Sequence, residues 1–311
     1  DLYLDALAFL PHWQETIGAL DAIARRGGGN LPVPRIETKL GGNAANLALG
    51  LAELGVQVDL IAETDPLGHH LLSRAAEGTS LRTDRVRLGD KCSVTLGLEC
   101  PDANVMLSHA GPLAAFGPER LEAEDLRRIR EADAVAVVNW AQNPHGTDLL
   151  ATLADAVGDE TFLYLDTGDP RHRPDDAMRL VENEAVWDRV DAWGLNENEL
   201  GAFTRDAPGD PVFLAQALAR RLGTRLDLHT RGWAATVTAD SIVRVDASDE
   251  PARRTTGAGD AWNAGNIAAG LLGWPDRERL AFAHRTATAH VTGANTAGTA
   301  EATVLTGGGP S

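Results

Sequence analysis

Two glycines flank an alanine in Gly257-Ala258-Gly259, and Asp260 follows at once; this stretch constrains the fold more than any other. The small and apolar residues after it recur at helical spacing as far as Leu272. A glycine-rich turn exposes backbone N–H groups, and the helix that begins there adds the positive end of its dipole, so together they favour an anion. Asp260 would lie in the first helical turn, within reach of a hydroxyl. A general base beside an anion site is what phosphorylation of an alcohol requires, although a glycine turn without a ligand gives the same pattern.

A second glycine motif lies far upstream, where Gly41-Gly42 runs through Asn43 and Asn46 into an apolar helix. A glycine pair lets a ligand approach the backbone closely. The two asparagines lie one turn apart and offer both donors and acceptors to hydroxyl groups. A capped, buried helix without a ligand is the alternative.

Strand and helix patterns alternate from residue 119 onward, with helices predicted at 119–131, 144–157 and 175–186 and strands at 134–139, 161–166 and 190–195. This alternation predicts a mostly parallel sheet with helices on both faces, whose strands end at one edge. Asn139, Asp166 and Asn196 each follow a predicted strand, so we expect them at that edge. For Asp166 a turn cap is the favoured interpretation.

Asn196 and Glu199 lie three residues apart at a strand-to-helix junction and therefore share one helical face. Such a pair can hold water-ligated Mg²⁺ beside phosphate oxygens. A helix cap explains the same spacing, and without other context it is the more common explanation.

Together these residues resemble the ribokinase-like (PfkB) carbohydrate kinase family. The first family signature matches from Gly41 to Gly68 and the second from Thr255 to Leu272, with further matches at 196–199 and 230–232. Two independent glycine motifs more than two hundred residues apart are far more specific than either alone.

The resemblance implies a role for each matching residue. Asp260 would be the catalytic base, with the amides of Gly257, Ala258 and Gly259 as the anion hole. The substrate hydroxyls would be bound by Asp5, Gly41, Gly42, Asn43 and Asn46, and the predicted strand that contains Asp5 would end near it. The nucleotide would contact Thr230, Gly232, Asn196 and His284. Mg²⁺ would be held by Glu199 and Asn196.

The implied fold is a three-layer α/β/α sandwich with a mostly parallel central sheet and a small β lid. One domain would span residues 1–311, with the lid formed by about 31–41 and 91–111, and lid-mediated homodimers are possible. The implied reaction is ATP-dependent phosphorylation of a hydroxymethyl group on a sugar or related small carbohydrate. A nucleoside kinase of the same fold and a non-catalytic sugar or nucleoside sensor are the alternatives.

Charge and composition limit the expected partners and location. The chain has 28 basic and 45 acidic side chains, a net charge of −17, which argues against nucleic acids and anionic membranes as partners. No apolar run is long enough to span a bilayer and no export signal is visible, so we expect a cytoplasmic protein. Only Lys39 and Lys91 are lysines. This composition resembles that of proteins from salt-accumulating halophiles and suggests a need for high salt.

Arg254 departs from the family pattern. Many family members have an acidic residue at this position, where it helps to hold a monovalent cation. A guanidinium always carries a positive charge and cannot ligate a cation. We therefore expect no K⁺ site in the usual place.

We predict that stability and activity rise with ionic strength, because salt screens repulsion among the acidic side chains. Thermal unfolding and turnover would be measured in choline chloride from millimolar to molar concentration, and then with K⁺ substituted at constant ionic strength. Full stability and activity in millimolar buffer would contradict the salt requirement. Strict dependence on K⁺ would contradict the expectation for Arg254.

Overall fold

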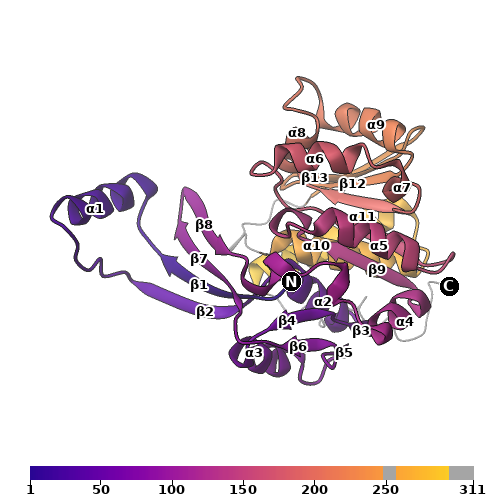
Figure 1. Ribbon diagram of the computed structural model, residues 1–311. Helices are drawn as coiled ribbons and strands as arrows, with labels where there is room; N and C mark the ends of the chain where they lie inside the picture. The colour runs from indigo at the N-terminus through magenta and orange to yellow at the C-terminus, as the bar shows by residue number, and fades with distance from the viewer. Residues whose placement is uncertain (248–256, 294–311) are drawn as a thin grey trace.

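The larger sheet has six strands in the order β14-β13-β12-β11-β10-β9 (Figure 1), in a computed structural model that describes residues 1–247 and 257–293. Its parallel strands are β9 (Ala134–Val138), β10 (Phe162–Asp166), β11 (Ala192–Leu195) and β12 (Arg225–His229). At one edge β13 (Trp233–Val237) and β14 (Ile242–Asp246) continue the sheet antiparallel. The mostly parallel sheet predicted from the sequence is confirmed, and its four parallel strands end at one edge.

Helices cover both faces of this sheet. One face carries α4 (Ala123–Glu131), α5 (Gly146–Ala156), α6 (Pro174–Val181), α7 (Glu184–Trp187), α8 (Glu197–Phe203) and α9 (Pro211–Leu222). The other carries α2 (Asn43–Glu53), α10 (Ala258–Leu271) and α11 (Asp276–Thr292). Successive strand residues alternate between the two cores, as Leu163 and Leu165 do against Tyr164. The result is the predicted three-layer α/β/α arrangement. Among the described residues, no helix combines the length and apolar character needed to cross a membrane.

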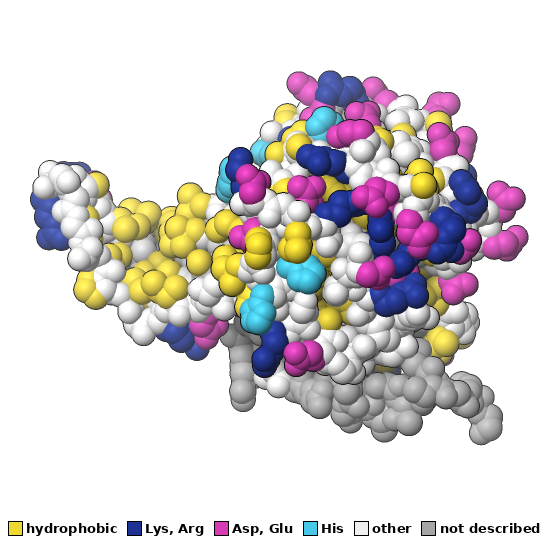
Figure 2. All heavy atoms as spheres, turned by 60° about the horizontal axis from the view of Figure 1, so that its bottom comes forward, with side chains coloured by type: hydrophobic (Ala, Val, Ile, Leu, Met, Phe, Trp, Pro, Cys, Tyr) yellow, Lys and Arg dark blue, Asp and Glu magenta, His cyan; other side chains and the backbone are white. Residues whose placement is uncertain are grey.

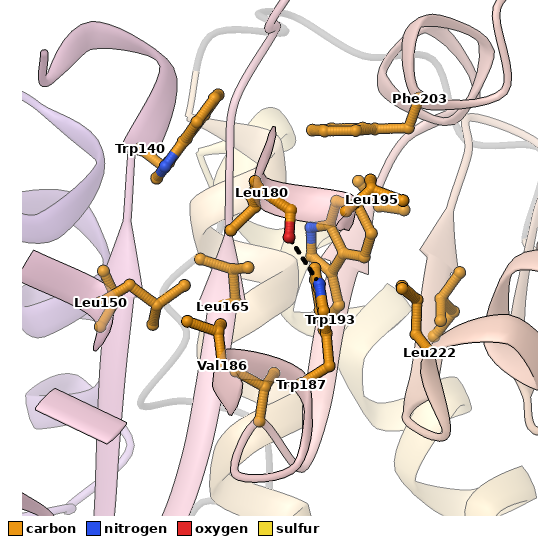
Figure 3. Close-up of a cluster of buried hydrophobic side chains, with 14 of the residues drawn as sticks. Trp140, Leu150, Leu165, Leu180, Val186, Trp187, Trp193, Leu195, Phe203 and Leu222 are labelled. Atoms are coloured by element: carbon orange, nitrogen blue, oxygen red, sulfur yellow. Dashed lines mark hydrogen bonds between the residues drawn. The ribbon is translucent and has the colours of Figure 1, made fainter. Parts of the chain in front are cut away.

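The first of these cores is mainly aliphatic and contains a group of packed aromatic rings (Figure 3). The ring of Trp187 lies 4.8 Å from that of Trp193, which meets Phe203 edge-on at 4.6 Å. Trp187 Nε1 donates a hydrogen bond of 2.8 Å to the backbone oxygen of Leu180, so the polar end of the ring is satisfied where it is buried. These contacts fix α7 and α8 against β11, the strand that ends next to Asn196.

Some elements differ from the predicted bounds for local reasons. The helix expected at 119–131 begins at Ala123, because Glu122 and Asp125 form a capping box there. The helix expected at 175–186 is divided into α6 and α7. The apolar run from Val56 to Ala62 forms two short strands, β3 (Val58–Asp59) and β4 (Ala62–Thr64). β3 pairs in parallel with β5 (Leu81–Arg82), and β4 pairs in parallel with β6 (Val86–Leu88). In the sequence, α3 (Pro66–Ala76) connects the first two strands to the last two.

A second sheet projects from the body as an arm (Figure 1). Its strands are β2 (Arg35–Gly41), β1 (Tyr3–Phe9), β7 (Ser93–Cys100) and β8 (Ala103–His109), in that order, and α1 (Trp13–Arg25) lies near its tip. It contains both ranges predicted for the lid and also β1. The expectation that the first strand ends near Asp5 is wrong, because β1 continues to Phe9 by pairing with both β2 and β7. Asp5 therefore lies in the middle of a lid strand.

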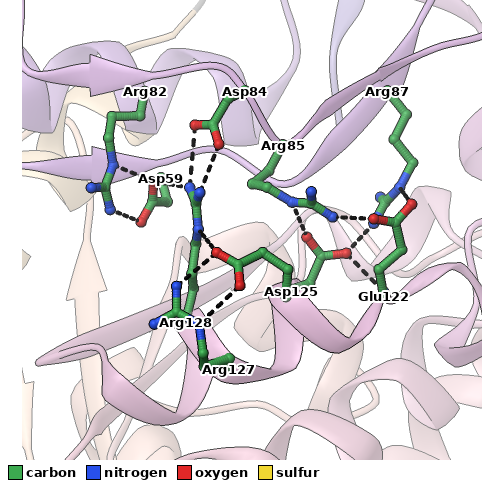
Figure 4. Close-up of polar contacts among 10 residues, drawn as sticks. Asp59, Arg82, Asp84, Arg85, Arg87, Glu122, Asp125, Arg127 and Arg128 are labelled. Carbon is green, nitrogen blue, oxygen red and sulfur yellow. Dashed lines mark hydrogen bonds and ion pairs between the residues drawn. The ribbon is translucent and has the colours of Figure 1, made fainter.

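An arginine–carboxylate network attaches β3, β5 and β6 to α4 (Figure 4). The buried Asp125 carboxylate accepts from Arg85 Nε at 2.7 Å and pairs with Arg87, while Arg128 reaches Asp59 at 2.9 Å and Asp84 at 2.7 Å. Burial alone would raise the pKa of Asp125, but hydrogen bonds from Arg85 and from the backbone of Glu122, together with the charges of Arg87 and Arg85, lower it. Because a buried charge needs partners that also donate hydrogen bonds, the planar guanidinium suits this position better than an ammonium group would.

Candidate active site

Asp260 lies at the start of α10, directly after the glycine turn. Gly257 has φ of 83°, in the left-handed region that favours glycine, and a Cβ there would lie 2.8 Å from Nε2 of His290. The first intrahelical hydrogen bond runs from Ala261 N to Gly257 O, and within residues 1–247 and 257–293 no backbone oxygen accepts from the N–H groups before it. The turn thus offers the donors expected of an anion hole. Thr255, Thr256 and Arg254 lie outside the described residues.

The two glycine motifs meet at Asp260. Asn46, on α2, donates a hydrogen bond of 2.9 Å from Nδ2 to Oδ2 of Asp260, although the residues are 214 positions apart. The Asp260 side chain is buried, at 8% exposure. Burial raises the pKa of Asp260 to about 7, the Asn46 hydrogen bond opposes this shift, and the charges of Asp166 and Asp5 add to it. A carboxylate with a pKa near neutrality is suited to accept a proton from a hydroxyl.

The upstream glycine pair allows the end of β2 to pass close to β1. A Cβ at Gly41 would lie 2.1 Å from Oδ2 of Asp5, and one at Gly42, where φ is 97°, would lie 2.9 Å from the backbone nitrogen of Tyr3. The group that approaches these glycines is therefore the Asp5 carboxylate, a part of this chain. Asn43 is the first residue of α2 and half-buried.

Polar side chains gather on the lid face that contains Asp5. Lys39 lies opposite Asp5 on β2, and Thr95 lies opposite it on β7. Burial raises the pKa of Asp5, while the Lys39 charge and a hydrogen bond with Thr95 oppose the shift. Asp5 and Lys39 also both act on the pKa of Asp260, in opposite directions. The lid thus presents a charged, hydrogen-bonding face to the candidate base.

Two further contacts at this edge have little or no signal in the sequence. Asn139 follows β9 with φ of 58°, unusual for a residue with a side chain, and donates from Nδ2 to Oδ2 of Asp1 at 2.6 Å. The other oxygen of Asp1 accepts from the backbone N–H of Ala44 at 2.8 Å. The position of Asn139 after a strand placed it at the edge, but no motif marks Asp1.

Asp166 takes the turn-cap role favoured from the sequence and has a second contact as well. Its Oδ1 accepts from the backbone N–H of Gly168 at 2.9 Å, and its Oδ2 accepts from Asn263 Nδ2 on α10 at 2.5 Å. Burial raises its pKa.

Asn196 and Glu199 form a reciprocal helix cap. Asn196 Oδ1 accepts from Glu199 N at 3.0 Å, and Glu199 Oε2 accepts from Asn196 N at 2.9 Å. Burial and then the charge of Asp166 raise the pKa of Glu199 to about 8. No cluster of three or more His, Cys, Asp or Glu ligands occurs among the described residues. A hard cation beside Asp166 and Glu199 would relieve the repulsion between them, so these oxygen donors fit Mg²⁺ that retains most of its waters.

The residues expected at the nucleotide lie around β12 and α11. Thr230 Oγ1 accepts from the backbone N–H groups of Gly232 at 3.2 Å and Trp233 at 3.0 Å, and so holds the turn after β12. His284, on α11, meets the Trp262 ring edge-on at 6.5 Å. The other side of Trp262 stacks on His229 at 4.9 Å, a contact that no sequence pattern indicated.

A groove lies away from this region. It has a volume of about 590 Å³, follows β9 and is lined mainly by apolar side chains, among them Val135, Val137 and Leu47. Three of the charged residues that line it, Asp59, Arg82 and Arg128, are already paired with one another. We therefore assign the candidate site by its chemistry, to the region around Asp260.

Comparison with known proteins identifies the family and the fold. Residues 10–303 match the sequence profile described as pfkB family carbohydrate kinase. No curated protein matches the chain. Ribokinase from Arabidopsis thaliana, complexed with ribose and ATP, is 20% identical with a TM-score of 0.73 over 96% of this chain and 93% of that one. Ribokinase from Thermotoga maritima is 17% identical (TM-score 0.74, covering 98% and 97%). A Burkholderia thailandensis nucleoside kinase in complex with inosine is 15% identical (TM-score 0.69, covering 94% and 89%). These similarities to solved structures establish the shared fold.

The raised pKa of Asp260 predicts how stability depends on pH. The folded state binds the Asp260 proton more tightly than the unfolded state does. The stability that this proton contributes is therefore fully present below pH 3.8, the pKa of an unfolded aspartate, and is lost as the pH rises through about 7. Because Asp260→Asn removes the ionisation, its stability relative to the parent protein should increase from about pH 5 to about pH 8, by at most about 3 kcal/mol. Urea unfolding of both proteins at each pH measures the difference in their free energies of unfolding. An equal difference at the two values would contradict the raised pKa.

Proposed function

Because the chain belongs to the pfkB family of carbohydrate kinases, phosphotransferases with an alcohol acceptor, we propose that it transfers the γ-phosphoryl group of ATP to a hydroxymethyl group of a sugar or related small carbohydrate. The observation that carries this proposal is the hydrogen bond of 2.9 Å between Asn46 and Asp260. It brings a carboxylate of raised pKa, the donors of a helix start and the lid residues to one place.

Asp260 is the general base of this reaction. Its carboxylate takes the proton of the acceptor hydroxyl, and the oxygen attacks the γ-phosphorus. The new O–P bond forms as the bond to the β,γ-bridging oxygen breaks, and ADP leaves with that electron pair. The proton stays on Asp260 until it is released to solvent. The amides of Gly257, Ala258 and Gly259 stabilise the charge on the transferring group.

The acceptor is bound between the lid and the sheet edge. Asp5 and the asparagines at 43 and 46 offer acceptors and donors to hydroxyl groups, while Gly41 and Gly42 let the end of β2 pass close to β1. Closure of the lid excludes water, which would otherwise compete with the acceptor for the phosphoryl group.

The nucleotide is bound by Thr230, Gly232, Asn196 and His284, which lie after β12, at the start of α8 and on α11. Glu199, with Asn196 beside it, would hold Mg²⁺ together with Asp166, which the sequence did not indicate as a ligand. When bound, the cation neutralises charge on the phosphates.

Asp260→Asn should lower turnover by about 10²–10⁴-fold, the usual contribution of a positioned general base, while substrate binding survives. Turnover would be measured as ADP formed with ATP and a panel of sugars and nucleosides, and binding by calorimetry. Asp240→Asn, at an exposed position, is the matched control. Near-normal turnover in Asp260→Asn would contradict the mechanism. Turnover on nucleosides alone would favour the nucleoside kinase alternative, and none on any acceptor would favour the sensor.

We further propose that the protein is a homodimer that pairs through the outer face of the lid. Alternate residues of each strand point to the face of the sheet opposite Asp5. On this face Ala6 of β1 is paired with Leu96 of β7, which is in turn paired with Leu107 of β8. Ile36, Leu96 and Leu107 on this face are 63%, 43% and 55% exposed. Figure 2 shows hydrophobic side chains gathered along the arm. In a chain of charge −17, an uncharged apolar face is where a second copy can approach without strong repulsion.

Ile36→Asp and Leu107→Asp should convert the dimer to a monomer, because each places a charge in the paired face. Phe213→Asp is the matched control, since Phe213 is 66% exposed but lies on α9, away from the lid. Sedimentation equilibrium gives the masses. A parent protein that stays monomeric at high concentration, or lid variants that keep the dimer mass, would contradict the proposal.

A further inference from the structure

His229 is the last residue of β12, and its ring lies beside the anion hole. It stacks on Trp262, with ring centres 4.9 Å apart and planes 25° apart. A Cβ at Gly259 would lie 3.4 Å from Nε2 of His229. Because Trp262 is one turn after the glycine turn in α10 and only 2% exposed, the stack holds the imidazole in a fixed orientation.

The surroundings of the ring determine which nitrogen carries its proton. Nδ1 of His229 is buried and has no hydrogen-bond partner among the described residues. Burial, with a smaller effect from His284, lowers the pKa of His229 to about 4, so the ring is neutral at physiological pH. A buried N–H without a partner costs more than a buried lone pair without one. The proton therefore lies on Nε2, the nitrogen next to Gly259.

We propose that His229 is a fourth donor of the anion hole, and that its Nε2–H binds an oxygen of the terminal phosphates of ATP. This inference rests on the proposed kinase function. Trp262 is then a positioning residue, because it acts through the imidazole.

A neutral donor has a specific advantage in this place. A lysine or arginine here would bind phosphate strongly, but its charge would also favour the ionised form of Asp260 and weaken it as a base. A neutral imidazole binds the phosphate and leaves the basicity of Asp260 almost unchanged.

Two substitutions test the donor. His229→Leu keeps an apolar contact with Trp262 but removes the N–H, and should lower kcat/KM for MgATP about 10- to 100-fold, the effect of losing a hydrogen bond to a charged group. His229→Gln places an amide N–H near the position of Nε2 and should recover most of that loss. KM for the acceptor should stay within about twofold in both. The matched control is His70→Leu, at an exposed position on α3. A His229→Leu variant with unchanged kcat/KM, or a Gln variant no better than Leu, would overturn the proposal.

Nitrogen NMR of ¹⁵N-histidine-labelled protein tests the same proposal without turnover. The free protein should show the Nε2–H tautomer for His229, assigned by its loss in His229→Leu, and addition of ADP should shift this resonance. An Nδ1–H tautomer, or no shift at saturating ADP, would overturn the role of His229 while leaving the kinase proposal intact. If calorimetry detects no ADP binding and no acceptor is phosphorylated, the kinase proposal fails and this inference fails with it.

Discussion

The hydrogen bond between Asn46 and Asp260 is the contact on which the rest of the site depends. It joins α2, which continues directly from the lid strand β2, to α10, which begins at the glycine turn. The two helices can lie this close because small residues separate them: a Cβ at Gly50 would lie 3.0 Å from that of Ala264. Any larger side chain at Gly50 would push α2 away and pull Asn46 from the carboxylate. The lid, the base and the anion hole are therefore held by one helix pair.

Buried carboxylates in this chain fall into two groups. Asp227 is fully satisfied by Thr236 at 2.7 Å, Asn266 at 2.9 Å and Arg279 at 3.2 Å, and its pKa is lowered to about 2. Its role is to hold β12 and β13 against α10 and α11. In the second group, burial raises the pKa of Asp5, Asp166, Glu199 and Asp260, because their hydrogen bonds and neighbouring charges do not offset the effect of burial. Groups that are costly to ionise cluster where a protein binds ligands and moves protons. The second group surrounds the proposed acceptor and phosphate positions.

The sequence was informative where a pattern has one physical cause. The three strands between 134 and 195 and the helix at 144–157 followed from hydrophobic periodicity, and the two glycine motifs marked positions where the chain reverses or passes another segment closely. It could not reveal partners that only the tertiary fold brings together. Asp1 accepts a hydrogen bond from Asn139 at the sheet edge, and His229 on β12 stacks on Trp262 on α10. The extent of β1 was missed because its length depends on pairing with β2 and β7, which no local pattern reports.

The pH dependence of kcat/KM in the parent protein and in Asn46→Ala tests the central claim most directly, once an acceptor is known. If Asn46 stabilises the ionised base, the rising limb of the parent profile lies near 7, and in Asn46→Ala it moves to higher pH with much of the rate recovered there. If the limb stays at the same pH in both proteins, the carboxylate at 260 is not the group that takes the proton.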